Sequence, residues 1–129
     1  MSVQFLKADC QNTTSEIRFG LSDAEDMMPV KIKLTEEELW NATVLNNDSK
    51  NILVTAVDNC IDVFRQNGEM ENRCDCMLTY DTTILFVELK NKRDSWQSEG
   101  LFQIENIVKI MIAETPDYYN NFKKRRASS

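Results

Sequence analysis

Two acidic residues and a lysine stand where neighbouring strands of a predicted hairpin would bring them together. Residues 73–80 and 83–90 each have the apolar and β-branched composition of a strand, and a short polar turn separates them. Asp75 lies on the first strand. Glu88 and Lys90 end the second strand two residues apart, and therefore on one face of it. Two ionised carboxylates at such a distance repel each other unless a cation lies between them.

A carboxylate pair of this kind suits a hard divalent cation. Mg²⁺ prefers carboxylate oxygens and keeps several waters, and Mn²⁺ takes similar ligands. A neighbouring lysine can orient a bound water and stabilise negative charge that develops on a phosphate. Asp75, Glu88 and Lys90 therefore predict metal-assisted hydrolysis of a phosphodiester. The alternative for Glu88 is a strand-end ion pair with Lys90 or Arg93.

The composition removes several competing chemistries. The chain has 129 residues and no histidine, which excludes Ser-His-Asp and Cys-His catalysis and histidine-bound zinc. Its three glycines are scattered, which excludes a glycine-rich phosphate loop. The formal net charge of -6 argues against a dedicated nucleic-acid coat, because phosphate affinity comes mainly from lysine and arginine.

The elements that must position the three residues follow from the hydrophobic pattern. Apolar residues recur at spacings of three and four over residues 52–64, which predicts an amphipathic helix before the hairpin. The almost wholly apolar residues 84–87 predict a central strand covered on both faces. A loop is expected over residues 91–100, followed by a helix over residues 101–113 that ends before Pro116.

The remaining segments complete the predicted fold. Residues 16–21 and 30–34 alternate polar and apolar side chains, which indicates two half-buried strands. We therefore expect an α/β (α+β) domain over residues 1–122, with a mixed central sheet flanked by helices and an extra N-terminal β segment. Residues 123–129 are basic and are expected to form a disordered tail.

The order of these elements resembles the core of the PD-(D/E)XK nuclease superfamily, which has a restriction-endonuclease-like fold. The matching order is a helix, a strand with Asp75, a strand with Glu88-x-Lys90 and a second helix. It covers residues 52–113, about half of the chain. The resemblance implies that Asp75 and Glu88 bind the metal and that Lys90 assists the attacking water.

Two further residues enter through the same resemblance. Many members carry an acid on the preceding helix, where Asp58 and Asp62 stand here, and Asp58 is the preferred metal ligand. Some members place a glutamine on the helix after the lysine, which makes Gln103 a candidate catalytic residue. Ordinary polar or boundary positions are the alternatives for Asp58 and Gln103. Cys74 precedes Asp75 where the motif has proline, a change that the family tolerates widely.

The cysteines and the absence of sorting signals suggest a compartment. No secretory signal and no apolar run of membrane-spanning length are visible, so we expect a cytoplasmic protein. In that compartment Cys10, Cys60, Cys74 and Cys76 are expected to be free buried thiols rather than disulfides. Cys74 and Cys76, two apart on a strand, would face the same side, and a zinc half-site is the alternative reading.

Three functions fit these observations. The first is a nuclease that cuts DNA or RNA with Mg²⁺ or Mn²⁺, with a small basic cluster at Lys90, Lys92 and Arg93 beside the phosphate. The second is a catalytically silent protein of the same fold, of immunity or adaptor type, whose acidic surface binds a basic protein partner. The third is a homodimer in which pairing completes the site.

Overall fold

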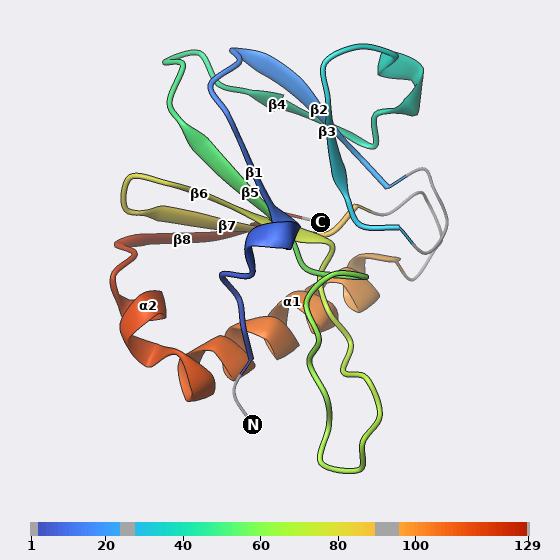
Figure 1. Cartoon of the computed structure of the whole chain (residues 1–129), viewed down its shortest axis with the longest axis vertical. Coiled ribbons are helices and arrows are strands. Elements are labelled where there is room, and N and C mark those ends of the chain that lie inside the picture. The colour runs from blue at the N-terminus through green and yellow to red at the C-terminus, as the bar shows by residue number, and fades with distance from the viewer. Residues whose placement is uncertain (1–2, 24–27, 90–95, 129) are drawn as a thin grey trace.

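The structure is a computed structural model that describes residues 3–23, 28–89 and 96–128, with backbone alone for residues 96–100 (Figure 1). Within these residues, one mixed sheet has the strand order β1-β5-β6-β7-β8, and one antiparallel sheet has the order β3-β2-β4. The strands are β1 (Gln11–Thr14), β2 (Arg18–Ser22), β3 (Lys31–Lys33), β4 (Ala42–Leu45), β5 (Ile52–Ala56), β6 (Cys76–Tyr80), β7 (Thr83–Val87) and β8 (Lys124–Ser128). The helices are α1 (Trp96–Glu114) and α2 (Pro116–Asn120), and short 3-10 turns span Ala8–Cys10 and Glu37–Leu39.

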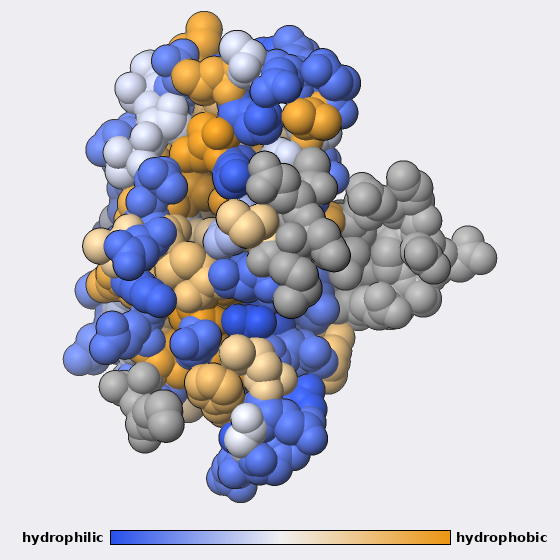
Figure 2. Space-filling model, turned by 45° about the vertical axis from the view of Figure 1, so that its right-hand side comes forward, coloured by the Kyte–Doolittle hydropathy of each residue, from blue (hydrophilic) through white to orange (hydrophobic). Residues whose placement is uncertain are grey.

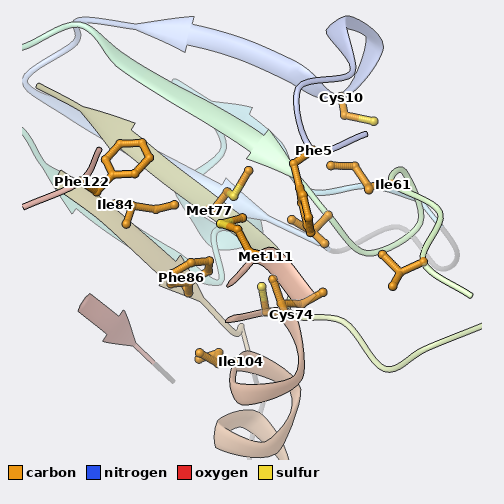
Figure 3. Close-up of a cluster of buried hydrophobic side chains, with 13 residues drawn as sticks. Phe5, Cys10, Ile61, Cys74, Met77, Ile84, Phe86, Ile104, Met111 and Phe122 are labelled. Atoms are coloured by element: carbon orange, nitrogen blue, oxygen red, sulfur yellow. The ribbon is translucent and has the colours of Figure 1, made fainter. Parts of the chain in front are cut away.

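The five-stranded sheet is the middle of three layers. One face packs against α1, and the other packs against the three-stranded sheet (Figures 1 and 3). The helix-side core joins sheet and helix residues, among them Met77, Ile84, Phe86, Ile104, Ile107 and Met111. The core between the sheets includes Phe19, Leu21, Val54, Cys76, Leu78 and Val87. Burial of these apolar surfaces is the main force that holds the layers together.

The predicted fold class is confirmed, and so is the hairpin. The protein is mixed α+β, with a mixed central sheet. β6 and β7 pair with Tyr80 opposite Thr83, which leaves a two-residue turn in which Asp81 has a positive φ of 50°. Such turns match the right-handed twist of the strands. β7 is a central strand covered on both faces, as expected, although helices cover just one face of the sheet and the second sheet covers the other.

The helix predicted over residues 52–64 is wrong. β5 occupies its first part and pairs antiparallel with β1 and β6. Apolar and small residues fill both faces of β5, because Val54 packs toward the second sheet and Thr55 is buried on the other side. A strand covered on both faces has no alternation, so its apolar residues imitate a helical stripe. Ile61 and Val63 then reach the helix-side core from a loop.

The C-terminal segments also differ from expectation. α1 begins at residue 96, inside the predicted loop, and Pro116 separates α1 from α2. The predicted disordered tail is wrong for residues 124–128, because they form β8, which pairs in parallel with β7. Parallel neighbours need a long crossover connection, and α1 and α2 provide it. In the part of the chain that the structure describes, no helix combines the length and apolarity needed to cross a bilayer.

The cysteines divide into two classes. Cys10 and Cys60 form a disulfide that joins the start of β1 to the loop after β5, so the expectation of free thiols is wrong for them. Cys74 and Cys76 are free and buried, as expected. They do not share a face, because Cys74 packs in the core beside α1 and Cys76 packs between the sheets.

Candidate functional site

Asp75 precedes β6 at a point where the pairing with β7 becomes irregular. The ladder pairs Cys76 with Val87, and the backbone N–H of Asp75 also donates to the carbonyl of Val87 at 3.1 Å. Two residues thus oppose one, which is the arrangement of a β-bulge. On the other side, the carbonyl of Asp75 accepts the N–H of Val57 at 3.0 Å. The bulge re-aims the Asp75 side chain and breaks the alternation that sequence reasoning assumed for the two neighbouring cysteines.

The Asp75 and Glu88 side chains meet at this end of the hairpin. Glu88 is 4 % exposed, and its N–H donates to the carbonyl of Ser128 at 2.9 Å, which ties the end of β7 to the end of β8. Oδ2 of Asp75 accepts the N–H of Leu89 at 2.5 Å. The two carboxyls are also hydrogen-bonded to each other. A hydrogen bond between carboxyls requires that one of them carries a proton.

The electrostatics of the pair follow from this geometry. Burial raises the pKa of Asp75 to about 8, and the charge of Glu88 and the hydrogen bond to it act in the same direction. The N–H of Leu89 partly opposes this rise. At neutral pH the pair therefore holds a proton between its two carboxyls.

Asp23 is a third acid near the pair that sequence reasoning missed. It follows β2, and its N–H donates to Oδ1 of Asn41 at 3.0 Å. Its negative charge raises the pKa of Asp75 further. From the sequence Asp23 belongs to an acidic, turn-like stretch, and its position directly after a strand was the one available signal. The packing of the two sheets, which carries Asp23 toward Asp75, is not readable from the sequence.

Asp58 lies close to the pair in the backbone but has another side-chain partner. Its N–H donates to the carbonyl of Asp75 at 3.3 Å. Its carboxylate forms an ion pair with Nη2 of Arg73 at 3.1 Å, and Nη1 of Arg73 donates to the carbonyl of Ile61 at 2.7 Å. Asp58 is on a loop rather than the predicted helix, and the structure gives its carboxylate to Arg73. Asp62, the other acid considered, is exposed on the same loop.

Of the remaining predicted residues, the structure describes Gln103 but not the basic ones. Gln103 lies on α1 beside the core residue Ile104, and among the described residues its buried Oε1 has no hydrogen-bond partner. Lys90, Lys92 and Arg93 fall outside the described residues, as does the candidate basic cluster that they form.

The buried thiols beside the pair are poor metal ligands. Burial raises the pKa of the Cys74 thiol, and the charges of Glu88 and Asp75 raise it further. Burial also raises the pKa of Cys76 well above its ordinary value. Cys74 and Cys76 also lie in different cores on opposite faces of the sheet, so they do not form the zinc half-site. Among the described residues, no group of three or more histidine, cysteine or acidic side chains is arranged to hold a metal ion.

Apolar surface and hollows occur away from the pair. A pocket of about 540 Å³ lies between α1 and the loop after β5, where Phe64 and Ile110 line it. Large apolar side chains are also exposed around the three-stranded sheet, including Ile17, Leu34 and Leu45. The face drawn in Figure 2 shows hydrophobic residues gathered among hydrophilic ones. These surfaces suit contacts with other molecules rather than bond cleavage.

The protein is therefore an α+β protein in which two carboxyls meet at a β-bulge. Comparison of the chain with family models, with curated proteins and with solved structures finds no match.

Proposed function

We propose that the protein hydrolyses phosphodiester bonds of DNA or RNA at the Asp75–Glu88 pair, with Mg²⁺ or Mn²⁺ as cofactor. The observation that carries the proposal is the meeting of these two carboxyls where the adjacent strands β6 and β7 begin and end, Asp75 directly before β6 and Glu88 directly after β7. The resemblance to the PD-(D/E)XK nucleases supports it through the two hairpin strands and the helix after them, because it implies metal binding by the same two residues. The helix that the resemblance places before the hairpin is strand β5 and a loop here.

The donor set of the pair fits a hard cation. Mg²⁺ in enzymes is commonly bound by one or two carboxylates, with waters and substrate phosphates as its other ligands. Two carboxyls are therefore enough, and a larger cluster of protein ligands is not required. When bound, the cation would polarise the phosphate and lower the pKa of a water.

The surrounding groups of the chain orient the pair. The N–H of Leu89 fixes one oxygen of Asp75, and the backbone bond to Ser128 fixes Glu88. Asp23 adds negative potential that attracts a cation to the pair. Lys90 follows Leu89 directly in the sequence, and we assign it the stabilisation of charge on the phosphate. The resemblance alone assigns Gln103, on α1, to orienting a water through its amide.

A cleavage assay tests the proposal. The full chain is incubated with fluorescently labelled single-stranded DNA, duplex DNA and RNA in Mg²⁺, in Mn²⁺ or in EDTA. We expect cation-dependent cleavage that Glu88→Gln and Lys90→Ala each reduce by at least about 100-fold. Lys109→Ala, which removes an exposed lysine from α1, is the matched control and should cut normally. Absence of cleavage on every substrate, or full activity of Lys90→Ala, would refute the proposal.

The alternative is a silent protein-binding module, and the exposed apolar side chains favour it. Ile17, Leu34 and Leu45 surround the small sheet of a chain that carries 21 acidic and 15 basic residues. Such a surface suits a basic protein partner. This function predicts no cleavage, together with binding that Leu34→Ser and Leu45→Ser weaken and Glu88→Gln leaves unchanged.

A further inference from the structure

Positive charge is concentrated on β8 and the residue directly before it. Lys123, Lys124, Arg125 and Arg126 are consecutive, and all four are exposed. They account for four of the chain's 15 lysines and arginines, whereas all 21 acidic residues lie elsewhere. An acidic protein thus carries one strongly basic strand, at the end of the strand order in its main sheet.

The alternation of β8 gives its basic residues two different roles. Arg125 pairs in register with Ile84, whose side chain faces α1. On that side the guanidinium lies 4.5 Å from the ring centroid of Tyr119, and Nε donates to the carbonyl of Phe122 at 2.9 Å. Arg125 therefore anchors β8 to the helical layer.

Lys124 and Arg126 project from the opposite face of the sheet. Their register partners are Thr83 and Leu85, which alternate with the helix-facing residues of β7. Neither side chain forms an ion pair with any residue that the structure describes. Residues two apart on a strand are separated by about 6.6 Å, so these two charges are spaced along the edge of the sheet.

β8 leads directly to the acid pair. It runs parallel to β7, and its Ser128 carbonyl accepts the N–H of Glu88. Arg126 lies opposite Leu85, which precedes Glu88 by three residues, or about 10 Å along the strand. This odd separation puts the Glu88 side chain on the face of Ile84 and Phe86, so an extended anion on Lys124 and Arg126 would reach the pair around the open edge at β8.

We propose that Lys124 and Arg126 bind successive phosphates of a polynucleotide backbone and direct it toward Asp75 and Glu88. This inference rests on the proposed function, because it assigns the substrate to that site. A polynucleotide fits better than a small anion, since two spaced and uncommitted cations on an otherwise acidic chain match a repeated charge. Edge strands also carry basic residues to prevent edge-to-edge aggregation, a role that requires no ligand.

Salt-dependent binding separates the two roles of these residues. Anisotropy of fluorescein-labelled single-stranded DNA, duplex DNA and RNA is measured in EDTA, between about 50 and 200 mM salt. The wild-type chain is compared with the double variant Lys124→Gln/Arg126→Gln. The matched control is Lys7→Gln/Lys109→Gln, which removes the same charge from exposed sites elsewhere. The variant Lys124→Arg/Arg126→Lys keeps the charge of β8.

We expect the wild-type chain to bind these nucleic acids. The slope of log affinity against log salt should be smaller in magnitude by about 1.4 to 1.8 in the Gln double variant, because two phosphate contacts are lost. The control and the charge-keeping variant should retain the wild-type slope. Equal slopes in all variants or no wild-type binding would overturn the inference. Binding that depends on β8 without any cleavage in Mg²⁺ or Mn²⁺ would support β8 and refute the nuclease function. Cleavage in Mg²⁺ or Mn²⁺ together with equal salt slopes would support the nuclease function and refute the role of β8.

Discussion

The proton held by Asp75 and Glu88 makes the stability of the fold depend on pH. The pKa of Asp75 rises from an ordinary 3.8 to about 8 on folding, first because of burial and then because of Glu88. Between these values the folded chain holds a proton that the unfolded chain releases. The free energy of unfolding is therefore highest below about pH 4 for this group and falls as pH rises toward 8, by up to about 1.4 kcal/mol per pH unit.

Asp75→Asn tests this reasoning, because the amide keeps the size of the side chain, still accepts the N–H of Leu89 and does not ionise. The difference in free energy of unfolding, variant minus wild type, should therefore become more positive by up to about 4 kcal/mol between pH 5 and pH 8, because only the wild type loses stability over this range. Urea unfolding at both pH values, followed by tryptophan fluorescence, gives the two differences. Asp62→Asn, at an exposed position, is the control and should leave the pH dependence of wild type unchanged. The same pH dependence in wild type and Asp75→Asn would refute a proton held by the pair.

Three further predictions concern the layers that support the site. Gly20→Ala should destabilise the fold by about 1–3 kcal/mol, because a Cβ would lie 2.1 Å from Cδ2 of Trp40; an unchanged urea midpoint would contradict this close packing. Reduction of the Cys10–Cys60 disulfide, which spans 50 positions, should lower the free energy of unfolding by about 2–4 kcal/mol. Urea unfolding curves measured with and without dithiothreitol test this, and identical curves would show that the bond adds no stability. Ile107→Ala should cost about 2–5 kcal/mol in the same assay, since Ile107 is fully buried between α1 and the sheet, and a loss below that range would contradict its place in the core.

The parts of the fold that were predictable from the sequence are local. The hairpin of β6 and β7 follows from two strand-forming runs separated by a short turn, and it brings Asp75 and Glu88 together. The alternation also predicted strand β2, although it indicated a half-buried strand and four consecutive residues of β2 are buried. In these elements each residue's environment is set by neighbours close in the chain, so pattern and structure agree.

The parts that were not predictable depend on contacts between distant segments. β5 lost its alternation because the second sheet covers one of its faces, and the same sheet carries Asp23 toward Asp75. β8 pairs with β7 across the whole helical crossover, so its exposed basic residues resemble a solvated tail in the sequence. The spatial proximity of Cys10 and Cys60 is likewise a result of folding.

If the Asp75–Glu88 pair binds a divalent cation, calorimetric titration of Mn²⁺ into the full chain at pH 7 should detect it. We expect one binding event in the wild type, accompanied by proton release that appears as a heat dependent on the buffer. Glu88→Gln should abolish this event, while the exposed control Asp62→Asn should retain it. No binding heat in the wild type, or an unchanged affinity in Glu88→Gln, would show that the pair is not a cation site.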